Sequence, residues 1–302
     1  MIGLAIGDAL GFPTEPLSLE AIRADYGPTG ITDFVSARGL PPGSYSDDTQ
    51  LTLATARALL AAGGQSTDEL MDAFCEEFLD WYRSPDVARG PGMTTLGALA
   101  NLAQGDPWNE SGIRSSKGCG GAMRVAPIGL YFYREREKLR HLAQLNCLIT
   151  HGHPTGVAAA VLNALAVARA VEKASPQKLL AELLSNAERL DADLAAALAK
   201  VKQCEGMEPP EAFAHIGETG SAEEVLASAL FCFLRSPRDY RATVLAAANS
   251  SGDSDSIAAM AGALSGAYNG LEAIPENWRQ AVENRDEIER LARALFTRAG
   301  PA

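Results

Sequence analysis

Apolar residues recur every three or four positions along most of the chain, which is the spacing of an amphipathic helix. In the stretch 47–62, for example, Leu51, Ala58 and Leu59 fall on one helical face. Ser46 or the aspartate after it can cap the start of this helix, and a pair of glycines ends it. The alternation of apolar and polar residues that marks a half-buried strand is scarce. The pattern therefore predicts an all-α protein.

The same spacing predicts further helices, which are separated by short polar connectors. They cover residues 67–82, 94–103, 139–149, 155–171, 176–201, 222–234, 239–248, 256–268 and 275–296. The most polar connector, 204–220, is predicted to be a loop that holds a short helix rather than a domain boundary. Small residues dominate 258–267, so this helix is expected at the centre, where backbones approach closely. The sequence shows no low-complexity linker and no repeat, which predicts one compact helical domain over 1–302.

Composition and charge argue against several classes of protein. The 302 residues carry a net charge of −12 and are 47% hydrophobic, which is a globular mixture rather than a disordered one. An acidic chain does not suit binding to nucleic acid through phosphates or to a membrane through a basic surface. No charge-free apolar run reaches about 18 residues, so we expect no membrane span. Asp8, expected to be a structural partner at a helix end, argues against a signal peptide.

The cysteines point to a reducing compartment. There are five, an odd number, and no two of them form a CxxC pair. A disulfide framework or a zinc site is therefore not expected. Reduced thiols and a cytoplasmic location are the simple prediction.

Two acidic motifs each precede a helix that is predicted to be buried. They are Ser-Asp-Asp at 46–48 and Asp-Ser-Asp-Ser at 253–256. Taken singly, each is explained as a helix cap that interacts with the positive end of the helix dipole. Taken together, their buried carboxylates would be costly without cations. Arginine or lysine from elsewhere in the chain could supply the positive charge, but two divalent ions bridged by the two motifs would do so more completely. Oxygen ligands suit Mg²⁺, Mn²⁺ or Ca²⁺. The second motif lacks the glycine and glutamate of an EF-hand.

Three other places carry candidate chemistry. The glycine-rich segment 118–124 offers backbone N–H groups to an anion, and a flexible turn is the equal alternative. Cys119 within it has no local base in the sequence, which argues against a nucleophile. His151 and His153 do not share a helical face, so a hydrogen bond from His151 to a ligand or a helix end is favoured over a metal site. Glu15 follows the first short helix on a loop, where a solvated glutamate is the simple alternative.

In this order, these motifs resemble the ADP-ribosylglycohydrolase family, which includes ADP-ribosylarginine hydrolases and dinitrogenase reductase-activating glycohydrolases. The resemblance runs from GLAIGDALGFPTE, which starts at residue 3, to AAMAGALSGAYNG, which ends at residue 270. The single motifs are modest, whereas their ordered combination is specific. The resemblance implies one orthogonal bundle of helices with two divalent cations, Mg²⁺ or Mn²⁺, in a central cleft.

The resemblance also implies roles for individual residues. The two acidic motifs match the family's metal ligands, here Ser46, Asp47, Asp48, Asp253, Asp255 and Ser256. Glu15 or the metal-bound Asp48 is the implied catalytic acid or base. The implied substrate-binding residues hold the phosphates, ribose and adenosine of ADP-ribose, and they are Gly92, Met93, Gly118, Cys119, Gly120, Gly121, Met123 and His151.

The chain departs from the family pattern at several positions. Serine replaces threonine at 46 and 256, which keeps the hydroxyl. Cys119 stands where asparagine or serine is usual. In the segment 89–95, Gly90 occupies the position of an aspartate that some members use as a catalytic base. Asp86 is nearby in sequence but out of register, so the identity of the base stays open.

The implied reaction is hydrolysis of the bond between ADP-ribose and a modified protein side chain. Arginine is the first expectation for this side chain, and serine-linked or O-acetyl-ADP-ribose are the alternatives. The implied partners are an ADP-ribosylated protein, ADP-ribose and an ADP-ribosyltransferase. Two rival hypotheses stay open, namely a module that binds ADP-ribose or blocks a transferase without turnover, and a metal-dependent phosphohydrolase. The retained aspartates favour the enzyme, because a pure binder does not need both motifs.

Overall fold

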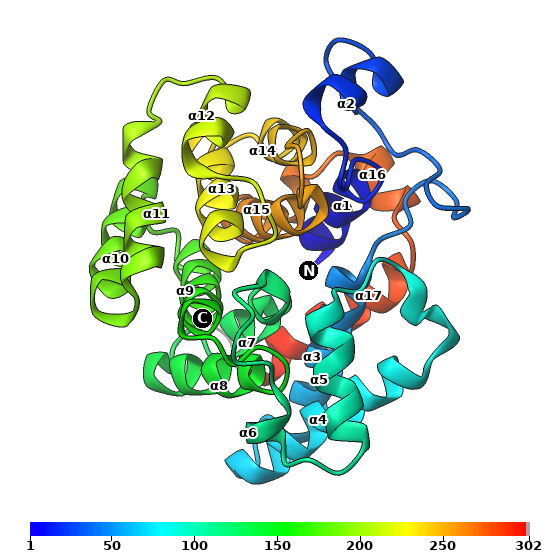
Figure 1. Cartoon of the computed structure of the whole chain (residues 1–302), viewed down its shortest axis with the longest axis vertical. Coiled ribbons are helices and arrows are strands. Elements are labelled where there is room, and N and C mark those ends of the chain that lie inside the picture. Colours follow the sequence, from blue (N-terminus) through cyan, green and yellow to red (C-terminus); the bar gives the residue numbers. More distant parts are fainter. Residues whose placement is uncertain (300–302) are drawn as a thin grey trace.

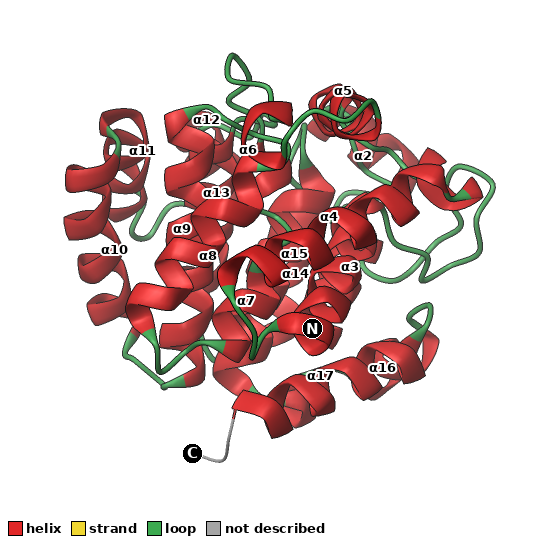
Figure 2. Cartoon of the chain, turned by 90° about the horizontal axis from the view of Figure 1, so that it is seen from below, coloured by secondary structure: helices red, strands yellow, loops and turns green. Residues whose placement is uncertain are grey.

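Every regular element of the described chain is a helix. The structure is a computed structural model that describes residues 1–299, and within that range it contains 17 α-helices, three short 3-10 helices and isolated bridges but no strand (Figures 1 and 2). The α-helices are α1 (Ile2–Gly11), α2 (Leu19–Tyr26), α3 (Asp47–Ala62), α4 (Thr67–Arg83), α5 (Met93–Ala103), α6 (Trp108–Ser111), α7 (Ala126–Tyr131), α8 (Arg136–Leu148), α9 (Pro154–Val171), α10 (Pro176–Leu190), α11 (Ala192–Gln203), α12 (Pro209–Ile216), α13 (Ala222–Arg235), α14 (Tyr240–Ala248), α15 (Ser254–Asn269), α16 (Glu276–Ala281) and α17 (Arg285–Ala299). The all-α prediction is confirmed for these residues.

Local capping explains where the helices begin. At the start of α3 the hydroxyl of Ser46 accepts the backbone N–H of Asp48, and at α4 the hydroxyl of Ser66 accepts that of Glu69. The side chain of Glu69 also bonds back to the backbone of Ser66, which completes a capping box. These caps satisfy N–H groups that have no partner within the helix. The boundaries predicted for these two helices therefore agree with the structure to within one residue.

Helices α1 and α15 lie side by side near the centre of the molecule, in dark blue and orange in Figure 1. Glycines make this close approach possible: a Cβ added to Gly7 would lie 2.0 Å from the carbonyl oxygen of Ala258, and one added to Gly11 would lie 2.3 Å from that of Ser254. The predicted central position of 258–267 is confirmed. The contact also places the end of α1 beside the start of α15, where the second acidic motif begins.

The prediction of one helix over 176–201 is wrong, because the chain breaks at Asp191 between α10 and α11. Asp191 has an extended backbone (φ −160°, ψ 128°), and its carboxylate accepts the backbone N–H of Leu194 at 2.9 Å. Its other carboxylate oxygen accepts the hydroxyl of Thr155 at 3.0 Å. An aspartate within a periodic stretch thus caps a new helix instead of continuing the old one.

The prediction of one helix over 275–296 is also wrong, because α16 and α17 are separate. Val282 has an extended backbone (φ −64°, ψ 137°) that ends α16, and Asn284, directly before α17, has a left-handed φ of 51°. Between them the backbone N–H of Glu283 donates to the carbonyl of Gly43 at 3.0 Å. The break is therefore fixed by a partner far away in sequence. The sequence did not predict α2, α6 or α7, whereas the short helix expected in the connector 204–220 is present as α12.

Helix α9 is apolar enough to raise the question of a membrane span. Over its 18 residues the mean hydropathy is 1.5, and it is the one helix among residues 1–299 that meets this criterion of length and composition. However, 78% of it is buried inside the structure, and the core helix of a globular protein has the same composition.

Candidate active site

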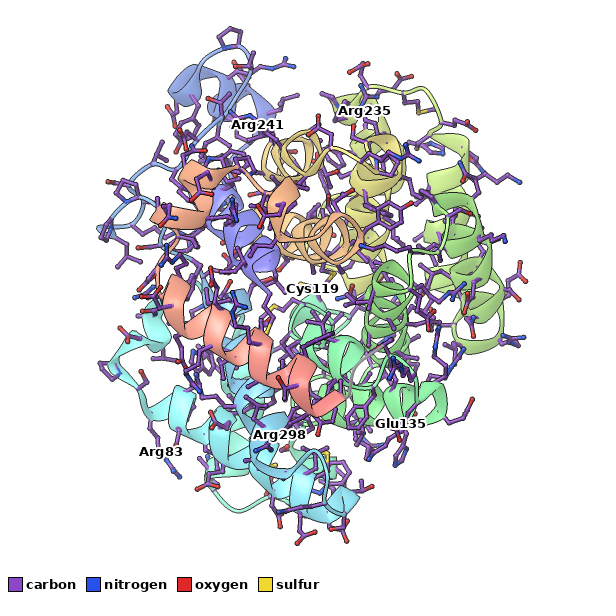
Figure 3. All side chains as sticks on the ribbon, turned by 180° about the vertical axis from the view of Figure 1, so that it is seen from behind. Arg83, Cys119, Glu135, Arg235, Arg241 and Arg298 are labelled. Carbon is purple, nitrogen blue, oxygen red and sulfur yellow. The ribbon has the colours of Figure 1, made fainter. Side chains whose placement is uncertain are left out.

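The structure brings the two acidic motifs together in one cavity. Glu15, Asp253 and Asp255 each present an oxygen within 4.8 Å of the oxygens of the other two. Asp47 and Asp48 line the same cavity, which has a volume of about 440 Å³. Cys119, which also lines it, is labelled near the middle of the molecule in Figure 3. Five carboxylates from three separate segments therefore line one open cavity.

Asp8 holds the first acidic motif in place. One oxygen of its carboxylate accepts the backbone N–H of Ser46 at 2.9 Å, and the other accepts the N–H and the hydroxyl of Thr49 at 2.9 and 2.6 Å. The residue is fully buried, and burial followed by the charge of Asp255 raises its pKa to about 7. Asp8 is thus a structural partner at a helix end, as expected, and it fixes the first turn of α3 against α1.

Burial and mutual repulsion act on the remaining carboxylates. Burial first, and the charge of Asp255 second, raise the pKa of Asp47, Asp48 and Asp253 well above the usual value. The same two causes raise the pKa of Glu15 to about 7, although an ion pair with Arg38 opposes them. Among the described residues that line the cavity, none is a lysine or an arginine. The charge of the cluster is therefore compensated only in part by the protein itself.

The donor atoms fit a hard divalent cation. The Oδ1 atom of Asp48 is buried and has no hydrogen-bond partner, although its Oδ2 accepts the hydroxyl of Ser46 at 3.3 Å. A buried carboxylate oxygen without a partner is costly, and a cation would satisfy it. Carboxylate and hydroxyl oxygens suit Mg²⁺ or Mn²⁺ better than Zn²⁺.

Most of the predicted substrate-binding residues line the cavity. Those that do so are Gly92, Gly118, Cys119, Gly120, Met123 and His151. Met93 and Gly121 do not: the side chain of Met93 is 81% exposed, and Gly121 packs against the thiol of Cys147. Ser46 is fully buried behind Asp48 and does not line the cavity either.

Some cavity residues were not predicted from the sequence. They are Pro16, Gly90, Thr94, Thr95, Thr219, Gly220 and Gly252. Thr94 and Thr95 belong to the segment 89–95, which resembles a segment of the family, so this resemblance could have predicted that they line the cavity. Thr219, Gly220 and Gly252 had no such signal, since their place depends on how the connector before α13 folds against the start of α15.

A buried network fixes the ring of His151. The guanidinium of Arg124 donates to the hydroxyl of Thr150 at 2.9 Å, and this hydroxyl lies 2.8 Å from Nδ1 of His151. Within the described residues the hydroxyl has no other acceptor, so it donates to Nδ1, and the proton of the neutral ring sits on Nε2. A Cβ added to Gly118 would lie 3.2 Å from that Nε2 atom. The ring thus presents an N–H donor to the glycine-rich loop.

We expect His151 to stay neutral between about pH 5 and pH 8. Burial, and secondly the charge of Arg124, lower its pKa to about 3, so the ring does not gain a proton in this range. The measurement is ¹⁵N NMR of the imidazole, with the signals assigned by their loss in His151→Gln. One protonated and one unprotonated nitrogen should persist across the range. Two protonated nitrogens at the acid end would contradict the network.

Cys119 is a hydrogen-bond donor rather than a nucleophile. Its thiol lies 3.0 Å from Oδ2 of Asp253 and 3.5 Å from the hydroxyl of Ser256. Burial first, and the charge of Asp253 second, raise the pKa of the thiol well above its usual value. A protonated thiol that bonds to a carboxylate agrees with the absence of a local base in the sequence.

Comparison with known proteins identifies the family. A model described as ADP-ribosylglycohydrolase matches residues 1–302. The chain belongs to the ADP-ribosylglycohydrolase family. Its relatives include the ADP-ribosylhydrolase ARH3 of Mus musculus, which is 30% identical over 287 residues that cover 83% of this chain and 76% of the relative. The ADP-ribosylarginine hydrolase Tri1 of Serratia proteamaculans is 26% identical over 313 residues, with 98% of this chain and 77% of the relative covered.

A solved structure supports the same family. It is titled an ADP-ribosylglycohydrolase-related protein complex, and it superposes with a TM-score of 0.78 at 32% identity over 98% of this chain and 95% of its own. The predicted fold class is thus confirmed down to the family. Membership in the ADP-ribosylglycohydrolase family supports a hydrolase that acts on ADP-ribosylated substrates, and the family is known for a binuclear site for divalent cations.

Proposed function

We propose that this protein hydrolyses the glycosidic bond between ADP-ribose and a modified protein side chain. The observation that carries the proposal is the meeting of Glu15, Asp253 and Asp255 within 4.8 Å in a cavity that Asp47 and Asp48 also line. Cleavage of a glycosidic bond passes through a transition state with a positive sugar ring, which acidic groups stabilise. A cavity of about 440 Å³ also has the size of a small-molecule site.

Two divalent cations, Mg²⁺ or Mn²⁺, would be held by the carboxylates of the two motifs. The proposed ligands are Asp47, Asp48, Asp253 and Asp255, together with the hydroxyl of Ser256. Bound cations of this kind supply Lewis acidity and lower the pKa of a water molecule. The hydroxyl of Ser46 does not reach the cavity, so its proposed role is to orient Asp48 through their hydrogen bond.

The chain's own residues would position the substrate and move the proton. The backbone N–H of Gly120 and the Nε2–H of His151 lie close together in the cavity lining, where they can bond to phosphate or ribose oxygens, whereas the N–H of Gly118 donates to the hydroxyl of Ser116 at 3.2 Å. Glu15 lies on the loop after α1, beside Asp255, and we assign the proton transfer to it. The buried Asp48 is the alternative. Binding energy from the nucleotide part would hold the anomeric carbon in place.

The candidate linkages differ in charge. Arginine is the first expectation from the sequence, and a side chain linked through its guanidinium is cationic. Serine-linked and O-acetyl-ADP-ribose are uncharged at the bond that breaks. Of the two relatives named above, Tri1 carries arginine in its name, whereas the name of ARH3 states no linkage. The charges around Glu15 therefore bear directly on which linkage this cavity accepts.

An assay of all three linkages tests the proposal. Purified protein is incubated with arginine-, serine- and acetyl-linked ADP-ribose in the presence of Mg²⁺, Mn²⁺ or EDTA, and free ADP-ribose is measured. We expect release with a divalent cation and none with EDTA, because the carboxylate cluster needs the cations to bind the sugar hydroxyls. Tight ADP-ribose binding without release would favour the binding or transferase-blocking module. Phosphate release from nucleotides would favour the phosphohydrolase.

A further inference from the structure

Arg38 lies beside the position where the site departs from the family pattern. A Cβ added to Gly90 would lie 2.9 Å from Nη1 of Arg38 and 3.7 Å from Oε2 of Glu15. Gly90 has a φ of +86°, which a residue with a side chain rarely adopts. The space that an aspartate at position 90 would need is therefore taken by a guanidinium.

Three contacts hold the guanidinium of Arg38 at the rim of the cavity. Its Nη2 atom donates to the backbone carbonyl and to Oε2 of Glu15, both at 2.9 Å. Its central carbon lies 4.4 Å from the centre of the Phe12 ring, in a cation–π contact. The side chain is 38% exposed, so solvent can reach it, and it stands behind Glu15 and Gly90 rather than in the cavity lining itself. Among residues 1–299, Glu15 is the one carboxylate of the cavity lining that forms an ion pair, and Arg38 is its partner.

The direction of the substrate follows from the proposed function, on which this inference rests. If Gly118, Gly120 and His151 hold the nucleotide part, the leaving side chain lies by Glu15 and thus by Arg38. In the reaction the water oxygen bonds to the anomeric carbon and gives one proton to Glu15, while the bond from that carbon to the side chain breaks with its electron pair going to the leaving atom. A serine oxygen takes up a proton, an acetyl group leaves as acetate, and an arginine leaves as a guanidine.

We propose that Arg38 selects for a neutral or developing anionic leaving group and against an arginine linkage. The transition state of an arginine-linked substrate carries one positive charge more than that of a serine-linked one, and a nearby guanidinium raises its energy. The missing carboxylate at position 90 acts in the same direction, because a negative group there would attract that charge. The preferred substrate class is thus O-linked ADP-ribose, in contrast to the first expectation from the sequence.

The test compares the ratio of kcat/KM for serine-linked and arginine-linked ADP-ribosyl peptides of the same sequence, with Mg²⁺ present. We expect the wild type to prefer the serine linkage. Arg38→Met, which keeps the apolar stem on Phe12, should lower this preference about tenfold, and Arg38→Lys should keep it. The control is Arg241→Met: Arg241 also donates to a backbone carbonyl, that of Thr32 at 3.0 Å, and stacks on a ring, that of Trp278 at 4.6 Å. Figure 3 shows it well away from Cys119.

Three outcomes would overturn the inference. A wild type that prefers the arginine linkage is one, and an unchanged preference in Arg38→Met is another. If Arg38→Met loses all turnover because Glu15 moves, the wild type decides: its preference should shrink between about 0.02 and 0.5 M salt, since the ions screen the guanidinium. A preference that does not depend on salt would contradict an electrostatic cause. If the wild type turns over no linkage at all, the proposed hydrolase function fails. If it turns over one or more linkages but shows any of the outcomes above, only the inference about Arg38 fails.

Discussion

Asp255→Asn is expected to abolish divalent-cation binding and to lower turnover about a thousandfold or more, with the helices intact. Asp255 acts on the whole cluster, because its charge is the second cause of the raised pKa of Asp47, Asp48 and Asp253. Asparagine keeps the shape of the side chain and removes the negative charge that would hold a cation. Calorimetric titration with Mg²⁺ and Mn²⁺, ADP-ribose release and circular dichroism measure the three parts of the prediction.

The same variant should be more stable than the wild type in the absence of cations. The pKa values of Asp8 and Glu15 are raised to about 7 in the folded protein, so their ionised forms oppose folding. Their protonated forms give stability that is fully present below about pH 4, the unfolded pKa, and is lost as the pH rises to about 7. The melting temperature of the cation-free wild type should fall over this range, and Asp255→Asn should flatten the fall.

Asp80→Asn provides the matched control for both measurements. Asp80 is an exposed residue of α4 and carries the same charge outside the cavity. This variant should bind cations and turn over substrate as the wild type does. Wild-type cation affinity in Asp255→Asn would contradict the metal assignment. A melting temperature that responds to pH as that of the wild type does would contradict the repulsion between Asp255 and the other carboxylates.

Gly7→Ala is expected to destabilise the protein by about 3 kcal/mol or more, since overpacking against a rigid backbone leaves no side chain to move aside. The added Cβ would lie 2.0 Å from the carbonyl oxygen of Ala258, so α1 and α15 would have to separate. Urea unfolding followed by circular dichroism measures the loss. Because this pair of helices also carries the acidic residues, cation binding should weaken in parallel.

Gly97→Ala is the control for this prediction. Gly97 lies within α5, and a Cβ there would have no neighbouring atom within 4 Å. Alanine is the better helix former, so this change should stabilise the protein by up to about 1 kcal/mol. Equal effects of the two substitutions would show that the contact between α1 and α15 is not as close as the structure has it.

Helices with strong local signals could be predicted from the sequence, and breaks that depend on distant partners could not. The cap at Ser46 and the small residues of 258–267 were sufficient for α3 and α15. The break at Asp191 depends in part on Thr155, and the break before α17 depends on the carbonyl of Gly43. Periodicity continues through both breaks, because buried apolar side chains stand on either side of each: Ala187 and Leu194 at the first, and Val282 and Ile288 at the second.

For the candidate site too, some features could be predicted from the sequence and others could not. The sequence marks the acidic motifs, and the family resemblance indicates that they meet. The contact between Arg38 and Glu15 joins residues 23 positions apart, and the chain between them consists of α2 followed by an irregular segment, so no periodicity predicts it. The donation from Arg124 through Thr150 to His151 is equally hidden, since it depends on how α8 ends against the glycine-rich loop.

The pairing of α1 with α15 has a consequence for synthesis of the protein. During synthesis α1 leaves the ribosome long before α15, so the face of α1 that carries Gly3, Gly7 and Gly11 has no partner until α15 emerges. The same delay applies to the cations, because Asp47 and Asp48 are made long before Asp253 and Asp255. A translation product that ends before α15 would thus lack Asp253 and Asp255 and would not bind the cations. Cation binding would therefore report that α15 has packed against α1.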